Sequence, residues 1–183
     1  MSQLQTLHSD TRSGTTHPVP ASPAAQDVGL LMLRLVLGVT IAAHGTQKLF
    51  GWFDGGGLDG TAQFFAASGY PAARTMAFVA GFIETTGGLA IAVGFLTPLA
   101  AAAVAGDMIN AVGVKWNGGF FAPTGVEYEL LIVVAALAVA VAGPGRIAVD
   151  RALPVLRAHR LAYGASAALV ALVTSGVFLL LRS

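Results

Sequence analysis

Titratable side chains lie inside apolar stretches of this sequence, at spacings that would place them on common helix faces. His44 and Lys48 are four residues apart at the end of an apolar run, so an α-helix puts both on one face. Glu84 stands alone in the next apolar stretch, and Asp107 and Asn110 lie three residues apart in the third. Imidazole, ammonium and carboxyl groups in apolar surroundings can hydrogen-bond a polar head group or hold and transfer a proton.

The overall composition places these groups in a membrane protein. Of the 183 residues, 55% are hydrophobic and 10% are charged, whereas about a quarter of the residues in a soluble domain are charged. The formal net charge of +1 offers no basic excess for phosphate groups, so we expect no nucleic-acid partner. The absence of cysteine excludes disulfides, thiolate metal sites and Cys-ligated iron–sulfur clusters. Any redox role must therefore use a bound cofactor or a partner protein, because no redox centre is visible in the chain.

The apolar stretches predict transmembrane helices, each of which needs about 20 mostly apolar residues. Five ranges meet or approach this length: 28–50, 74–96, 98–116, 126–142 and 161–181. The fourth is short, which makes its ends hard to place. The glycine-rich stretch between the first two ranges indicates a loop around one amphipathic turn. These ranges predict an all-α fold.

The placement of arginine predicts the orientation and the division of the chain. The 143–160 connection carries four arginines, and short basic connections stay in the cytoplasm. We therefore place this connection and the N-terminus in the cytoplasm and the C-terminus outside. The polar residues 1–27 are then a disordered cytoplasmic tail, residues 28–153 form the membrane domain, and residues 154–183 form a basic connection and a fifth transmembrane helix.

This topology gathers polar side chains in the outer half of the bilayer and predicts one pocket open to the outside. Its candidate residues are Arg34, His44, Lys48, Glu84, Asp107, Asn110 and Glu127, with Lys115 and Glu129 beside them. A charge at the bilayer centre costs about 2.5–3.5 kcal/mol, so such groups persist where they are paired, hydrated or used. Two interpretations stay open. The groups form either an ion-paired structural core that fixes helix register, or a polar pocket for a small ligand, a quinone head group or a proton path.

Some of these residues have alternative roles. Arg34 either lines the pocket or extends back to the inner membrane interface. Trp52, Trp116 and Tyr128 are typical of the aromatic belt at a membrane interface. We considered metal ligation by His44 together with the membrane-embedded acids and expect no metal site. The sequence assigns no catalytic residue.

Short motifs with glycine and charged residues run through residues 28–153. They are Arg34-x3-Gly38, His44-Gly45-x2-Lys48-Leu49, Ala80-Gly81-x2-Glu84-x2-Gly87-Gly88, Gly94, Glu127-Tyr128 and Gly143-Pro144-Gly145-x4-Asp150. In this order and at these spacings they resemble the DoxX family of small bacterial integral membrane proteins. The resemblance implies a four-helix transmembrane bundle in the bacterial plasma membrane. It also implies an association with oxidoreductases, of which DoxX-like proteins are small quinone-linked subunits.

We therefore expect an all-α protein: a transmembrane four-helix bundle of the DoxX type plus one additional C-terminal transmembrane helix. The preferred function is a membrane subunit of an oxidoreductase complex, either non-catalytic or quinone-binding, with quinone as the candidate cofactor. The alternatives are a transporter or channel for a small molecule or protons, and a membrane scaffold with a structural ion-paired core. The expected partners are the lipid bilayer, soluble or membrane oxidoreductase subunits, and a second copy of the chain in a homo-oligomer.

Overall fold

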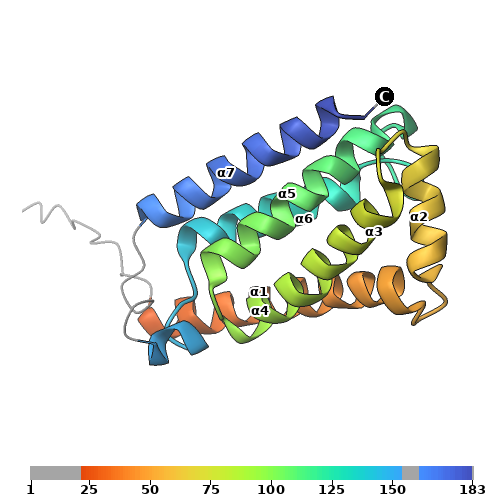
Figure 1. Ribbon diagram of the computed structural model, residues 1–183. Coiled ribbons are helices and arrows are strands. Elements are labelled where there is room, and N and C mark those ends of the chain that lie inside the picture. Colours follow the sequence, from red (N-terminus) through yellow and green to blue (C-terminus); the bar gives the residue numbers. More distant parts are fainter. Residues whose placement is uncertain (1–21, 154–160, 183) are drawn as a thin grey trace, which may run out of the picture.

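The protein is built from helices that run side by side, with one shorter helix across their end (Figure 1). The computed structural model describes residues 22–153 and 161–182, in which no β-strand occurs. The α-helices are α1 (Pro23–Phe50), α2 (Gly57–Ala67), α3 (Ala73–Phe82), α4 (Gly88–Val93), α5 (Thr97–Lys115), α6 (Glu127–Ala142) and α7 (Leu161–Leu180). The π-helix η1 (Ile83–Gly87) joins α3 to α4, and the 3-10 helices η2 (Trp116–Gly118) and η3 (Val149–Ala152) follow α5 and α6. The all-α prediction is confirmed.

Four helical segments in the described part of the chain are long and apolar enough to cross a membrane. They are Pro23–Phe50, Ala73–Val93, Thr97–Gly118 and Ala162–Leu180. The remaining predicted range, 126–142, forms α6, whose 16 residues fall short of the about 20 that cross a bilayer. Because α6 packs against α5 and α7, it completes the predicted bundle of four, with α7 as the additional helix.

The helix α1 is longer than the apolar run that predicts it. It begins at Pro23, which suits the first turn because no N–H is needed there. It ends at Phe50 and is followed by Gly51, whose φ of 71° provides the left-handed cap. Residues 23–27, which we expected in the tail, are therefore helical. The predicted tail up to residue 21 and the basic connection at 154–160 lie outside the described residues.

Glycines bring α1 against the α3–η1–α4 segment at backbone distance. A Cβ atom on Gly38 would lie 2.4 Å from the carbonyl oxygen of Gly88. A Cβ atom on Gly45 would lie 2.4 Å from the backbone nitrogen of Thr85. Since no side chain fits between these helices, the longer side chains beside the glycines come close enough to pair.

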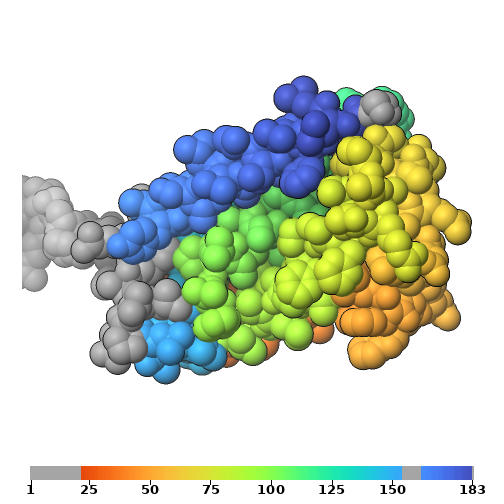
Figure 2. Space-filling model, in the orientation of Figure 1, coloured from red at the N-terminus to blue at the C-terminus, as the bar shows by residue number. Residues whose placement is uncertain are grey.

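The additional helix α7 packs against α5 and α6. Ser175 is buried there and donates a hydrogen bond to the carbonyl oxygen of Gly106 at 2.7 Å. Gly164 and Ala171 are buried on the same helix, as expected for a small-residue face that packs on the bundle. The helices α7 and α3 are separated from each other. Figure 2 shows α5 at the surface between them.

Candidate functional site

An ion pair between Lys48 and Glu84 lies at the centre of the site. Lys48 belongs to the last turn of α1, and Glu84 belongs to the π-helix η1. The ammonium group donates a hydrogen bond to Oε1 of Glu84. The Glu84 side chain is 1% exposed and the Lys48 side chain 30%. A π-helical turn inside an α-helix often occurs at a functional site, and this one carries the acid of the pair.

The helix α5 adds a second acid and an amide beside this pair. Asp107 interacts electrostatically with both Lys48 and Glu84. Asn110 accepts a hydrogen bond from the hydroxyl of Tyr70 at 3.3 Å. Tyr70 lies in the α2–α3 connection, where burial raises the pKa of its phenol above the usual range. The phenol therefore keeps its proton at neutral pH and can donate it in a hydrogen bond.

A second ion pair extends the polar cluster to the start of α6. Lys115 Nζ lies 2.8 Å from Oε1 of Glu129. Tyr128 interacts electrostatically with Glu84 and Glu129, and its ring centre is 5.4 Å from that of His44. Among the described residues, the Tyr128 hydroxyl and one oxygen of each of these two acids are buried without a hydrogen-bond partner. The cluster therefore keeps hydrogen-bonding capacity for another molecule.

A pocket of about 530 Å³ reaches this cluster from between α3 and α7. Its polar lining includes the side chains of Lys48, Asp107, Asn110 and Tyr70, and most of the remaining lining is apolar. Both its size and its composition are typical of sites for small molecules and cofactors, which are mostly apolar cavities with a few polar groups.

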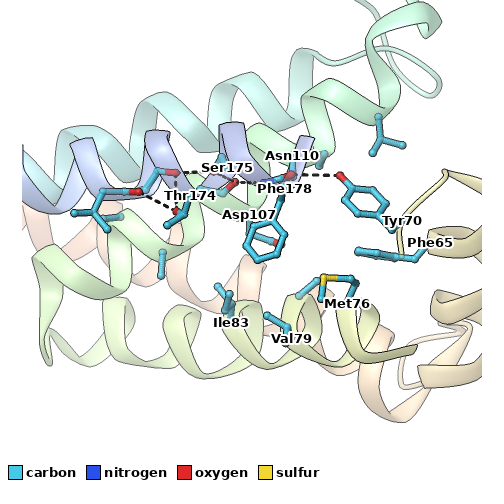
Figure 3. Close-up of a pocket in the computed structure, with 18 of the residues that line it drawn as sticks. Phe65, Tyr70, Met76, Val79, Ile83, Asp107, Asn110, Thr174, Ser175 and Phe178 are labelled. Atoms are coloured by element: carbon cyan, nitrogen blue, oxygen red, sulfur yellow. Dashed lines mark hydrogen bonds between the residues drawn. The ribbon is translucent and has the colours of Figure 1, made fainter. Parts of the chain in front are cut away.

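Figure 3 shows how the two walls of the pocket face each other. Asp107 and Phe178 point into the space from α5 and α7, and Val79 and Ile83 face them from α3 and η1. Thus a carboxyl group and apolar side chains share one cavity. In chemical terms, the cavity offers donors to a carbonyl oxygen, the carboxyl group of Asp107 that can exchange a proton, and an apolar wall.

Of the seven candidate residues, the structure brings five into this region: His44, Lys48, Glu84, Asp107 and Asn110. Glu127 lies in a different environment, since its Oε1 accepts a hydrogen bond from the backbone N–H of Ala122 at 2.9 Å. In residues 22–153 and 161–182, no group of three or more His, Cys, Asp or Glu side chains is placed to hold a metal ion.

Arg34 is separated from the pocket, contrary to the expectation that it could line it. Its side chain is buried and donates to the carbonyl oxygens of Pro144 and Ile147, the latter at 2.7 Å. Gly94 leaves room for the guanidinium, because a Cβ atom there would lie 2.5 Å from Nη1. Arg34 and Lys48 share a helix, but at 1.5 Å per residue they are about 21 Å apart along it. A common helix therefore does not make a common site.

Asp150 is a buried acid to which the sequence assigned no role. Its carboxylate accepts hydrogen bonds from the backbone N–H groups of Leu96 at 2.7 Å and Thr97 at 3.0 Å. It thereby caps the start of α5, where helical N–H groups have no partner of their own. Its place in the last family motif was the only signal that could have indicated it.

Sequence reasoning also missed two tyrosines of the site. Tyr70 was assigned only to a loop, and Tyr128 to the interfacial aromatic belt. Trp52 and Trp116, which the sequence placed in the same belt, are indeed exposed. A tyrosine between helices carries no periodic signal, so only the tertiary structure shows that Tyr70 meets Asn110.

Comparison with known proteins identifies the family. The DoxX family model matches residues 29–117. The chain is 30% identical over 125 residues to the Bacillus subtilis protein named "Putative oxidoreductase CatD", a match that covers 68% of this chain and 86% of that protein. The chain belongs to the DoxX family.

A second relative of this DoxX protein is named for its location. The chain is 30% identical over 135 residues to the "Inner membrane protein YphA" of Escherichia coli, with 70% of this chain and 92% of that protein covered. No solved structure matches the chain. Together with its four candidate spans, these relatives identify a multi-pass membrane protein.

Proposed function

We propose that this DoxX protein binds a quinone, as a small subunit of a membrane oxidoreductase. The observation that carries the proposal is the mostly apolar pocket whose lining includes Lys48, Asp107 and Asn110. A quinone needs an apolar cavity for its ring and hydrogen-bond donors for its carbonyl oxygens. The ammonium of Lys48 and the amide of Asn110 are such donors. The name of the Bacillus subtilis relative supports a redox association.

The acids of the site suit the proton transfer that accompanies quinone reduction. Reduction of a quinone to a quinol consumes two electrons and two protons. Asp107 lines the pocket beside the donors and can pass a proton to the ligand's oxygens, and the enclosed Glu84 lies next to it. A partner subunit of the oxidoreductase supplies the two electrons, because this cysteine-free chain has no thiol redox couple.

We also propose that the end of the bundle with Arg34 faces the cytoplasm. Arg146 lies at this end and pairs with Asp27 near the start of α1, with 2.6 Å between Nε and Oδ2. The start of α1 and the 143–153 segment are thus on one side, as the arginine count in the sequence requires. The polar cluster then lies toward the outer side of the membrane.

The test is to count quinones bound to gently purified protein by mass spectrometry of extracted lipids. Wild-type protein is expected to retain a quinone, and Asp107→Asn is expected to retain about tenfold less, equivalent to ~1.4 kcal/mol. Asp59→Asn is the matched control, because Asp59 is exposed and pairs with Arg74 away from the pocket. Equal retention by Asp107→Asn and wild type would contradict the proposal. Protein without quinone but with intact ion pairs would favour the scaffold alternative.

A further inference from the structure

The pocket is much longer than a quinone ring. Its lining follows α5 from Leu99 to Val114, a distance of about 22 Å at 1.5 Å per residue. The polar side chains from α1 and α5, Lys48, Asp107 and Asn110, gather toward one end. The other end is lined by Leu99, Ala103 and residues of α7 such as Ser166 and Ala167. The cavity is therefore a groove with its charged groups toward one end and a long, mostly apolar continuation.

The long side of this groove opens toward the lipid. Val79 on α3 and Val170 on α7 stand on opposite walls and are 37% and 62% exposed. Leu99, at the apolar end, is 61% exposed. All three lie in segments long and apolar enough to cross the membrane. In a bilayer these exposed side chains contact lipid tails, so the opening between α3 and α7, seen in Figure 2, connects the groove to the membrane interior.

The charges at the polar end select the kind of head group. Lys48 is already paired with Glu84, and Asp107 places a second carboxyl group next to that pair. Lys48, a base that lines the groove, is already held by these two acids, so it leaves little positive charge for a carboxylate or phosphate head group. A neutral head that accepts and donates hydrogen bonds needs no such charge.

We infer that the groove between α3 and α7 binds the apolar tail of a single-tailed lipid-soluble molecule with a neutral head, which enters sideways from the bilayer. The inference rests on the proposed function and adds a tail site and a route of entry to it. α7 forms one wall of the tail site and lies outside residues 29–117, which match the family model. The additional helix therefore contributes to ligand selection as well as to packing.

The test compares a ring-only quinone with the same ring carrying a long polyprenyl tail. Ala167→Trp fills the tail half of the groove, and native mass spectrometry in bilayer discs measures the occupancy of each compound. The variant is expected to lose about tenfold in affinity for the tailed quinone and to bind the ring-only quinone as wild type does. Ala162→Trp on the exposed face of α7 is the matched control, and it should bind both compounds normally.

The outcomes separate the two proposals. If wild type binds both quinones and Ala167→Trp keeps its preference for the tailed one, the tail site is wrong and the proposed function stands. If wild type binds neither compound, the proposed function fails. Tighter binding of a long-chain fatty acid than of the tailed quinone would overturn the neutral-head requirement. Ala103→Trp repeats the test from α5, in case the α7 variant unfolds.

Discussion

Lys48 and Glu84 form an asymmetric pair in which the acid is enclosed and the base faces the pocket. The side chain of Glu84 is 1% exposed, whereas that of Lys48 is 30% exposed and lines the cavity. Of the two groups, only the ammonium can turn toward a ligand without crossing the protein interior. The acid is therefore placed to stabilise the packed interior, and the base is the member of the pair that is placed to contact a ligand in the pocket.

Removing one member of this pair is expected to destabilise the protein strongly. Lys48→Met leaves a buried carboxylate without its counter-ion, and Glu84→Gln leaves the ammonium without its acceptor. Loss of one partner of a buried pair costs about 3–5 kcal/mol. The double variant Lys48→Met/Glu84→Gln removes both charges and should recover much of that loss. Unfolding in detergent, followed by circular dichroism, measures all three variants.

The exposed pair Arg74 and Asp59 provides the control cycle. Their side chains are 67% and 78% exposed, and exposed pairs contribute about 0–1 kcal/mol. Removing either member should change stability little. If the Lys48 and Glu84 variants behave like these surface variants, the buried pair has no structural role.

Arg34→Lys is expected to destabilise the protein without affecting ligand binding. The guanidinium donates to two carbonyl oxygens, and the single ammonium of lysine cannot reproduce this fork. A lost hydrogen bond to a charged group costs about 1.5–3 kcal/mol. The measurements are the unfolding midpoint and quinone occupancy. Normal stability combined with lost quinone would show that Arg34 belongs to the pocket after all.

Gly88→Ala is expected to weaken the contact between α1 and α4. The added Cβ would lie 2.5 Å from the backbone nitrogen of Ala42, and overpacking of this kind costs about 1–3 kcal/mol. Gly29→Ala in α1 is the control, because nothing lies within 4 Å of a Cβ there. That variant should be neutral or more stable, since alanine favours helix. Equal unfolding midpoints for both variants would refute the close approach.

Tyr128→Phe is expected to leave the isolated protein as stable as wild type, or more so. The Tyr128 hydroxyl is buried without a hydrogen-bond partner among the described residues, and such a group costs about 1–3 kcal/mol. Under the proposed function, the same variant assembled with its oxidoreductase partner should slow quinone reduction, because it has no hydroxyl to bond the ligand or a proton carrier. A clear drop in stability would show that the hydroxyl has a structural partner.

The membrane-spanning helices were predictable because a lipid bilayer requires long apolar runs, and such runs can be recognised in the amino-acid sequence. The π-helix at Ile83–Gly87 was not, since one extra residue in a turn leaves hydropathy unchanged. The short α6 was predicted from its own apolar run, but its ends were hard to place because 16 residues fall below the usual length of a span.

For the site, residue types and helix faces indicated which groups meet, but not how they pair. Whether Lys48 bonds Glu84 or Asp107 depends on the rotation of α1 against η1, which the glycine contacts determine. Arg34 shows the opposite failure, since it was predicted to share a pocket with Lys48 although their separation along the helix axis keeps them apart. The position of Tyr70 depends on the path of the α2–α3 connection, and sequence periodicity does not describe the path of a connection.

The cap that Asp150 places on Leu96 and Thr97 has a consequence for biosynthesis. The ribosome completes Ala73–Val93 and α5 well before it reaches residue 150. The hairpin formed by these two segments therefore enters the membrane before the turn between them is capped. The turn acquires its final hydrogen bonds only when the segment after α6 arrives, and Arg34 binds that same segment to α1. A nascent chain cut before residue 150 should therefore insert its helices yet remain open to cellular quality-control proteases.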